Sequence, residues 1–374
     1  MLNKDLKILQ LGKFYPIKGG VEKVAYDLML GVSSRGIRCD MSCAASQGEG
    51  GIRVINDHAS LITTKSLTKL ASTMISPNMI FALKKFCDRY DIIHVHHPDP
   101  MACVALFLSG YKGRVILHWH SDIIKQRILL KFYKPLQNWL IKRADIIIGT
   151  TPTYLEESPF LKNYKDKLRC IPIGIDPVNV DEYSSRQLRK KYGNKKIVFL
   201  LGRLVEYKGY EYLIESAKYL PNDYIVLIGG TGPLKESLEE KIRVNNLSSK
   251  VEMIGRIEES DLSKYYASCD VFCLPSIYKT EAFGIVQIEA MSCGKPIVAT
   301  SIPHSGVSWV NKNNISGINV VPRSSKELAD AIIKITSDSS VYNKYSIGAR
   351  ERFNALFRKE KMIESCLDIY AQTI

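Results

Sequence analysis

Several hallmarks of common protein classes are missing from this chain of 374 residues. No apolar run approaches the roughly 18–20 residues that a membrane-spanning helix requires. The N-terminus, MLNKDLKILQLGKFYP, is too polar for a secretory signal peptide and is typical of a first strand. The nine cysteines follow neither metal-ligand spacing nor a disulfide framework, so we expect buried thiols in a reducing cytoplasm.

Motifs for cofactors and metals are missing as well. The glycine fingerprint of dinucleotide-binding enzymes, G-x-G-x-x-G, does not occur, which disfavours a dehydrogenase. Asp-x-Asp, with which transferases usually hold a divalent ion under a sugar diphosphate, is also absent. His94, His96 and His97 suggest zinc, but His-x-His-His on one strand directs its side chains to both faces of a sheet. We therefore expect neither a metal nor a cofactor.

Positive charge is concentrated in the first half of the chain. The formal net charge is +14, and residues 1–177 hold 25 Lys and Arg against 15 Asp and Glu. This balance indicates an anionic partner: phosphates, nucleic acid or a membrane surface. No zinc finger, aromatic RNA-binding signature or arginine-rich arm accompanies the charge, so nucleic acid is the least favoured of the three.

Short apolar, β-branched runs alternate with helix-length amphipathic stretches, which predicts parallel sheets covered on both faces. The polar stretch 177–195 separates two series of such runs. We therefore predict an α/β protein of two doubly wound, Rossmann-like domains, 1–177 and 178–374, each with its ligand edge at the carboxyl ends of the strands. The predicted strands are 6–12, 92–97, 114–120 and 144–150 in the first series and 196–202, 224–230, 251–255, 270–276 and 296–300 in the second.

Glycine and basic loops follow three of these strands. Gly19 and Gly20 precede a helix that starts near Val21, where backbone amides can approach an anion, although an ordinary connection is equally compatible. In GRLVEYKG, Arg203 and Lys208 lie five residues apart and could reach one diphosphate; alone, the loop could simply be solvated. In a third loop, LIGGTGPLKE, the glycines precede another helix, and a plain turn is nearly as compatible with the pattern.

The sharpest motif is PSIYKTEAFGIVQIEAMSCGKPIVAT. Glu281 lies in a loop after a strand, and Glu289 follows eight residues later on an amphipathic helix, so both carboxylates can lie toward one side of that helix. The alternative is a capping Glu and a surface Glu. Because the surroundings of Glu289 are apolar, its carboxylate needs a partner. His120 ends another predicted strand, where catalytic groups gather.

Together, these motifs resemble the family 4 retaining glycosyltransferases of GT-B fold, in the same order and over nearly the whole chain. The block EAFG…EAM..GKP.VAT is specific, whereas P..GG.E and GRL…KG are weaker. The resemblance implies two Rossmann-like domains around a central cleft, with an acceptor-binding N-terminal domain and a nucleotide-sugar-binding C-terminal domain. It also implies that the last helix, about 356–374, can pack back on the N-terminal domain.

The resemblance further implies roles for individual residues. Glu281 would bind hydroxyls of the donor sugar, Glu289 the ribose, and Arg203 with Lys208 the diphosphate, in place of a metal. Gly20 would approach the phosphate, and His120 would contact a donor hydroxyl. The implied catalytic residues are Glu281, His120, Arg203 and Lys208, and the implied donor-binding residues are Gly19, Gly20, Gly202, Arg203, Lys208, Gly230, Gly232, Arg256, Ile257, Glu281, Ala282, Phe283, Gly284, Ile285 and Glu289.

Two positions near the domain junction bear on the acceptor side. Asp176 matches a family position there, whereas Ile173 replaces the asparagine that the family usually has. The function implied is transfer of a hexose from a nucleotide-sugar to a growing, lipid-linked bacterial surface polysaccharide. GDP-mannose is the favoured donor, and a UDP-sugar is the next. The alternatives are a non-catalytic nucleotide- or glycan-binding subunit and an inverting GT-B enzyme or epimerase.

One further segment indicates a partner surface. Residues 123–143, IIKQRILLKFYKPLQNWLIKR, contain six basic residues and no acidic one, interleaved with apolar and aromatic side chains. Such segments lie flat on anionic membranes, although a helix packed on its own sheet with a solvated basic face fits nearly as well. We expect a cytoplasmic protein that is peripheral on the inner face of the plasma membrane, bound through residues that include Lys125, Arg127, Lys131 and Lys134.

Overall fold

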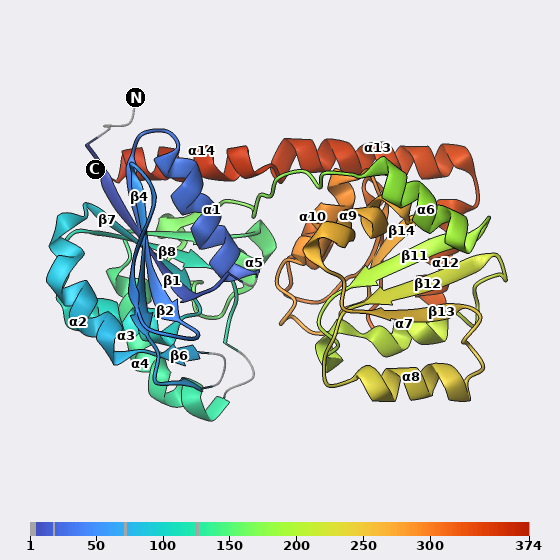
Figure 1. Ribbon diagram of the computed structural model, residues 1–374, viewed down its shortest axis with the longest axis horizontal. Coiled ribbons are helices and arrows are strands. Elements are labelled where there is room, and N and C mark those ends of the chain that lie inside the picture. Colours follow the sequence, from blue (N-terminus) through green and yellow to red (C-terminus); the bar gives the residue numbers. More distant parts are fainter. Residues whose placement is uncertain (1–4, 18, 71–72, 124–126, 374) are drawn as a thin grey trace. The chain divides into compact units, whose positions relative to one another are not determined.

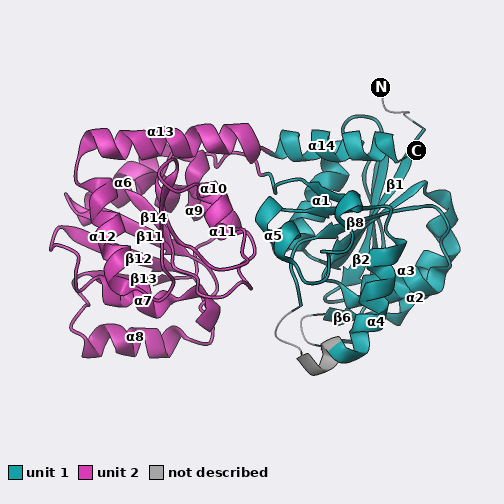
Figure 2. Cartoon of the chain, turned by 180° about the vertical axis from the view of Figure 1, so that it is seen from behind, with its two compact units in different colours: residues 1–174, 359–374 teal, residues 175–358 magenta. Residues whose placement is uncertain are grey.

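The computed structural model describes residues 5–17, 19–70, 73–123 and 127–373, with the backbone alone for residues 127–130. The chain forms two compact units: unit 1 comprises residues 1–174 and 359–374, and unit 2 comprises residues 175–358 (Figure 2). The chain thus passes to unit 2 three residues before the predicted boundary and returns to unit 1 for its last helix.

Unit 1 contains a parallel sheet with one antiparallel edge strand. Among the described residues, its eight strands follow the order β10-β9-β8-β7-β1-β2-β4-β3, and only β3 runs antiparallel to its neighbour. Since β1 pairs with both β2 and β7, the strand order reverses beside β1. The strands of unit 1 are β1 (Lys7–Tyr15), β2 (Arg38–Ala45), β3 (Gly51–Asn56), β4 (Ala59–Lys65), β5 (Thr68–Leu70), β6 (Thr73–Ile75), β7 (Ile92–His97), β8 (Arg114–Trp119), β9 (Ile146–Gly149) and β10 (Leu168–Cys170).

Helices cover both faces of this sheet, with α1 and α14 on one side and α2, α3 and α4 on the other (Figure 1). Helix α3 begins at Pro100 because the carboxylate of Asp99 accepts hydrogen bonds from the backbone amides of Met101 and Ala102, at 3.1 and 3.3 Å. The helices of unit 1 are α1 (Val21–Ser33), α2 (Pro77–Phe86), α3 (Pro100–Ser109), α4 (Arg127–Arg143), α5 (Pro152–Glu157) and α14 (Lys359–Gln372), with the 3₁₀ turns η1 (Cys87–Arg89) and η2 (Lys165–Lys167).

Unit 2 contains a fully parallel sheet. Among the described residues its six strands follow the order β13-β12-β11-β14-β15-β16, so the order reverses between β11 and β14. The strands are β11 (Lys196–Leu201), β12 (Tyr224–Gly229), β13 (Val251–Gly255), β14 (Val271–Leu274), β15 (Ile297–Thr300) and β16 (Gly317–Val320). The helices are α6 (Glu182–Tyr192), α7 (Tyr210–Ser216), α8 (Lys235–Val244), α9 (Glu259–Ser268), α10 (Ile285–Ser292), α11 (Val307–Val310), α12 (Ser325–Thr336) and α13 (Ser339–Leu356), with the turn η3 (Glu206–Lys208).

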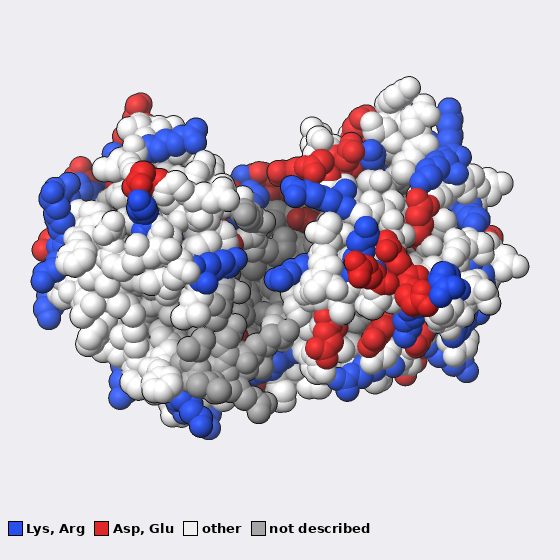
Figure 3. Space-filling view, turned by 60° about the horizontal axis from the view of Figure 1, so that its bottom comes forward, with Lys and Arg blue, Asp and Glu red and all other residues white. Residues whose placement is uncertain are grey.

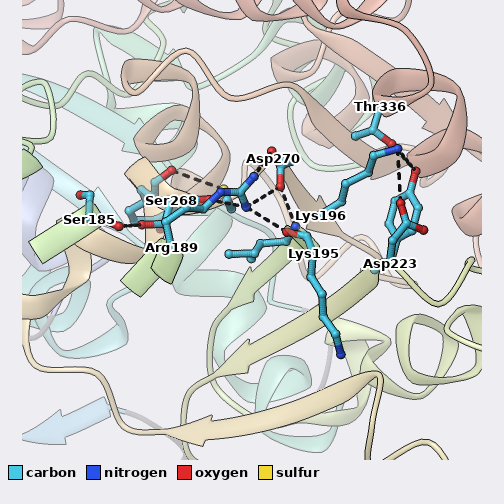
Figure 4. Close-up of polar contacts among 12 residues, drawn as sticks. Ser185, Arg189, Lys195, Lys196, Asp223, Ser268, Asp270 and Thr336 are labelled. Atoms are coloured by element: carbon cyan, nitrogen blue, oxygen red, sulfur yellow. Dashed lines mark hydrogen bonds and ion pairs between the residues drawn. The ribbon is translucent and has the colours of Figure 1, made fainter. Parts of the chain in front are cut away.

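A bidentate ion pair fixes the amino-terminal edge of this sheet (Figure 4). Arg189 on α6 donates hydrogen bonds of 2.8 and 2.9 Å to Asp270, which precedes β14. Asp270 also accepts a 2.6 Å hydrogen bond from the backbone amide of Ile197 in β11. The two central strands are therefore tied together at their amino-terminal end.

The predicted strands all correspond to observed ones, to within three residues at each end. The seven strands β2–β6, β10 and β16 were not predicted. The antiparallel pairing of β3 with β4, and that of β5 with β6 in a separate two-stranded sheet, correct the expectation of parallel sheets. All nine cysteines are free thiols; seven are buried as expected, but Cys170 is exposed and Cys293 half-buried. No helix in the described part of the chain is long and apolar enough to cross a membrane.

Five histidines are buried in unit 1, which is unusual for so polar a side chain. The rings of His118 and His120 stack with centroids 4.1 Å apart, and that of His97 stacks on Trp119 at 3.8 Å. Burial lowers the pKa of all five below the usual value of 6.5, and that of His97 and His118 to about 3. These side chains are therefore neutral at pH 7. The five residues are His94, His96, His97, His118 and His120.

These histidines should make the protein sensitive to acid. Unfolded histidines titrate near pH 6.5, so below that pH the unfolded chain binds more protons, and stability is lost as the pH falls toward the folded pKa. Each buried histidine should remove about 1.4 kcal/mol per pH unit in this window. Between about pH 6 and pH 5, we expect His118→Gln to lose about 1.4 kcal/mol less unfolding free energy than the wild type, in urea unfolding followed by tryptophan fluorescence.

The variant His58→Gln serves as the control because His58 is an exposed histidine of the same unit. It should lose as much stability as the wild type over this pH interval. Burial raises the pKa of Asp99 to about 7, so protonation of this carboxylate increases the stability of the folded protein as the pH falls. This contribution opposes that of the histidines and is the same in all three proteins. An equal loss in wild type and His118→Gln would contradict the prediction.

Candidate functional site

The loops after β11 and β12 pack closely at the carboxyl edge of the sheet in unit 2. The backbone amide of Gly202 donates to the carbonyl of Gly229 at 3.1 Å, and that of Gly230 donates to Gly255 at 2.7 Å. Gly230 has a φ of +133°, and a Cβ there would lie 1.8 Å from the carbonyl oxygen of Gly202. Only glycine fits this position, so backbone rather than side chain lines the edge. Gly232 continues the same loop.

A buried ion pair connects the loops that follow β11 and β14. Lys208 lies at the end of η3, and its Nζ is 2.6 Å from Oε2 of Glu281. Only 8% of Lys208 and 9% of Glu281 is exposed. The hydroxyl of Ser276 donates to the same carboxylate oxygen at 3.2 Å. The pair lies at the point where the strand order reverses, which is where open α/β sheets bind their ligands.

Lys208 keeps its positive charge in this environment. Burial alone would lower the pKa of the ammonium, but the charge of Glu281, with smaller contributions from Tyr207 and Glu289, outweighs burial and raises that pKa. The pair can therefore supply a fixed cation and a fixed carboxylate, poorly screened by water, to an incoming ligand.

The helix after Glu281 adds a second positive feature. Gly284 has a φ of +75° and is the N-cap of α10, which begins at Ile285. The first amides of a helix have no acceptor within the helix, and the helix dipole favours an anion beside them. Ala282 and Phe283 are buried in the turn that leads to these amides. The loop thus places a carboxylate next to a helix N-terminus.

Glu289 lies on α10 and has the partner that its apolar surroundings required. The hydroxyl of Tyr266 on α9 donates to its carboxylate. Tyr266 is fully buried, and burial together with Glu289 raises the pKa of its phenol well above 10. Because α10 starts only at Ile285, Glu281 precedes the helix and Glu289 lies within it, and the two carboxylates have different partners.

The other predicted residues of unit 2 lie at the same edge but are more accessible. Arg203 follows β11 and is exposed. Arg256 follows β13, and its guanidinium lies 2.9 Å from the carboxylate of Glu258, with both side chains largely exposed. The half-buried Ile257 packs against Gly229, where its Cδ1 would lie 2.6 Å from an added Cβ. The carboxyl edge thus has a buried centre and a solvated basic rim.

Three predicted residues belong to unit 1. Gly20, after Gly19, has a φ of +65° and is the N-cap of α1, as the glycine pair predicts. His120 follows β8, and its backbone amide donates to the carbonyl of His97 at 3.0 Å. The neighbouring Asp122 holds Trp119 in place by accepting a 2.9 Å hydrogen bond from the indole nitrogen. Near the boundary, Ile173 is buried and Asp176 is exposed.

Sequence reasoning missed the histidines that meet across two strands. His94 and His96 share one face of β7 and His97 the other, as the alternation predicts, but β7 pairs with β8 in register. A ring nitrogen each from His96, His118 and His120 therefore lies within 4.8 Å of the other two, a grouping that could hold a metal ion. Ser276 and Tyr266, the partners of the two glutamates, were also missed, because nothing in the local sequence indicates which side chains meet in space.

Comparisons with known proteins agree with this architecture. The family model described as Glycosyltransferase Family 4 matches residues 18–179, and that described as Glycosyl transferases group 1 matches residues 181–352. The O-antigen chain mannosyltransferase C of Escherichia coli is 31% identical over 98% of both chains. The D-rhamnosyltransferase WbpZ of Pseudomonas aeruginosa is 28% identical over 94% of this chain and 92% of that protein.

Solved structures share the fold. Anabaena HepE in complex with UDP has a TM-score of 0.79 at 19% identity and covers 98% of this chain and 100% of its own. Sucrose-phosphate synthase from Thermosynechococcus elongatus has a TM-score of 0.78 at 22% identity and covers 98% of both chains. The chain therefore belongs to the family 4 glycosyltransferases, has the GT-B fold of two Rossmann-like domains, and is related to bacterial polysaccharide mannosyltransferases.

Proposed function

We propose that this enzyme is a retaining hexosyltransferase that moves a sugar to a growing, lipid-linked bacterial surface polysaccharide. GDP-mannose is the favoured donor, and a UDP-sugar is the next. The observation that carries the proposal is the buried Lys208–Glu281 pair at the reversal of strand order in unit 2. The names of the two relatives, an O-antigen chain mannosyltransferase and a D-rhamnosyltransferase, support a role in surface polysaccharide synthesis.

In the proposed reaction, negative charge grows on the departing nucleoside diphosphate. Lys208 and Arg203, together with the first amides of α10, would stabilise that charge, and preorganised groups of this kind act most strongly where water is excluded. Glu281 would accept hydrogen bonds from hydroxyls of the sugar while it keeps its contact with Lys208, and Glu289 would bind the ribose. Two protein cations can thus do the work that a divalent metal does in other transferases, so we expect transfer without added metal.

Retention of configuration would follow from attack on the same face as departure. The acceptor oxygen bonds to the anomeric carbon while the bond from that carbon to the phosphate oxygen breaks. The acceptor's proton passes to the departing phosphate oxygen, so no protein side chain needs to act as the general base.

A screen of donors tests this function. We expect GDP-mannose to raise the melting temperature and to be turned over in the presence of EDTA and a lipid-linked glycan acceptor, with UDP-sugars weaker. The product linkage, read by NMR, should keep the configuration of the donor. Inversion would indicate the inverting alternative, and donor binding without turnover in the presence of acceptor would indicate a non-catalytic subunit.

Replacing Glu281 and replacing Lys208 should have different effects on the rate of transfer and on the affinity for nucleoside diphosphate. Glu281→Gln should reduce transfer at least 100-fold, because contacts to the sugar strengthen in the transition state, and should leave nucleoside diphosphate affinity within a few-fold. Lys208→Ala should weaken nucleoside diphosphate binding about tenfold or more and slow transfer as well, because it removes a charge-assisted contact. Calorimetric titration and initial rates measure the two effects.

Removal of one member of a buried ion pair also destabilises a protein, by roughly 3–5 kcal/mol. Each variant should therefore be compared below its own melting temperature. The matched control is the exposed ion pair of Lys235 and Glu239 on α8, 3.7 Å apart, whose substitution should leave both quantities unchanged. Wild-type transfer by Glu281→Gln would show that the sugar site lies elsewhere.

We also propose that unit 1 binds an anionic membrane surface through α3 and α4. The exposed side chains there include Lys131, Phe132 and Lys134 on α4, with 81% of Phe132 exposed, and Phe107 and Leu108 on α3. This apolar and basic patch fits an interfacial mode of binding. In Figure 3, the face of unit 1 turned forward has few charged side chains, whereas unit 2 mixes acidic and basic ones. Of the predicted contacts, Lys125 and the side chain of Arg127 lie outside the described residues.

Loss of this patch should release the enzyme from membranes. For the triple variant Lys131→Gln, Phe132→Ser, Lys134→Gln we expect at least about a tenfold weaker partition onto phosphatidylglycerol vesicles, since each basic residue near an anionic surface contributes about 1 kcal/mol. Sedimentation with the vesicles measures it. The control, Lys235→Gln with Lys344→Gln, removes two exposed charges from unit 2 and should bind as the wild type does. Unchanged sedimentation of the triple variant would remove α4 from the interface.

A further inference from the structure

A continuous chain of hydrogen bonds runs from His120 through the core of unit 1 to the C-terminal helix. Nε2 of His120 lies 3.0 Å from Nδ1 of His96, and Nε2 of His96 lies 2.9 Å from Oε1 of Gln10 on β1. The amide nitrogen of Gln10 donates to the hydroxyl of Tyr370 on α14 at 3.0 Å, and that hydroxyl lies 2.7 Å from Nδ1 of His94. All members are fully buried except His120, which is 6% exposed.

With the Gln10 amide oriented as in the structure, the donors and acceptors of this chain set where each proton lies. The carbonyl oxygen of Gln10 can only accept, so Nε2 of His96 carries the proton of that neutral ring. Nδ1 of His96 is then an acceptor, and Nε2 of His120 must be the donor to it. A neutral imidazole carries one N–H, so Nδ1 of His120 presents a lone pair.

The orientation of the Gln10 amide determines the direction of every hydrogen bond in the chain. Its nitrogen has two protons: one goes to Tyr370, and the other faces the sulfur of Cys39 at 3.6 Å. The hydroxyl of Tyr370 accepts from Gln10 and donates its own proton to Nδ1 of His94. In this orientation every proton in the chain is assigned, and donation runs from His120 through His96 and Gln10 to Tyr370 and on to His94.

Nε2 of His94 is one open end of the chain, and Nδ1 of His120 is the other. Among the described residues each is a buried nitrogen without a hydrogen-bond partner. A buried acceptor left without a donor is destabilising, so the arrangement favours a ligand that brings a hydroxyl or N–H to Nδ1 of His120.

We propose that Gln10, His96 and Tyr370 are positioning residues that hold His120 in its Nε2–H tautomer, so that Nδ1 accepts a hydrogen bond from a hydroxyl of the donor sugar. This inference rests on the proposed function, in which His120 contacts the donor. It assigns a part in the site to Tyr370, which lies on the last helix of the chain, 250 positions from His120 in the sequence.

A metal ion at the three histidines would require a different proton arrangement. It would bind one ring nitrogen lone pair from each of His96, His118 and His120, whereas the hydrogen bond between His96 and His120 needs a proton on one of its two nitrogens. Elemental analysis of the purified enzyme therefore belongs to the test. The proposal would be overturned if the purified enzyme contained one equivalent of a transition metal and removal of that metal changed the histidine tautomers.

The tautomers can be read directly by NMR. In the full-length enzyme labelled with ¹⁵N-histidine, long-range ¹H–¹⁵N spectra should show protonated Nε2 and unprotonated Nδ1 for His120, His96 and His94, with assignments from single histidine variants. In Gln10→Leu, His120 should become a mixture of tautomers. A protonated Nδ1 on His120 in the wild type would overturn the proposal, whether or not any donor has been found.

Kinetics supply the second measurement. Gln10→Leu and Tyr370→Phe should each lower kcat/KM for the donor about tenfold, the effect of losing one well-placed hydrogen bond. Tyr224→Phe is the matched control, because Tyr224 is a buried tyrosine of unit 2 whose hydroxyl bonds to Thr336. Wild-type kcat/KM in both variants would overturn the positioning role. Absence of turnover in the wild type with every donor would instead count against the proposed function and would leave the tautomers to decide this inference.

Discussion

A lysine and a glutamate that are both more than nine-tenths buried cannot be separated without a large cost, because neither charge would regain water. The pair of Lys208 and Glu281 therefore fixes two loops that are 73 positions apart in the sequence. The surrounding turns bring the two residues together. η3 brings the lysine to the end of β11, and the turn before α10 presents the glutamate. The close glycine contact between the β11 and β12 loops keeps side chains out of the same edge. A ligand that binds there meets charges already in place.

The sequence predicts the scaffold of this edge better than it predicts the contacts made on it. Continuous apolar runs predict central strands such as β7 and β11, because a strand that is covered on both faces must be apolar throughout. The strands near the outer edges of the sheets, such as β3 and β16, carry mixed residues and leave no such signal. The positions of Glu281, Lys208 and Gly20 follow from the rule that ligands bind after the carboxyl ends of strands, together with the family resemblance.

The partners of those residues could not be predicted, for a physical reason. Tyr266 meets Glu289, and Tyr370 meets Gln10, through packing between elements that are distant in the sequence. The histidines illustrate the same limit. Alternation along one strand correctly separates His96 from His97, but only the register between β7 and β8 brings His96 beside His118. A single sequence carries the alternation and not the register.

The path of the chain has a consequence for synthesis. Unit 2 is an insertion in unit 1: the chain leaves unit 1 after Gly174, and the parallel bridge between Ile175 and Arg358 brings the outgoing and returning segments side by side. On a ribosome, which makes proteins from the N-terminus, all of unit 2 is available to fold before unit 1 has its last helix. The side chains of Ile363 and Tyr370 close the core of unit 1 from that helix. The N-terminal unit is thus the one that is completed last, and a chain that stops before residue 359 would contain a complete unit 2 and an incomplete unit 1.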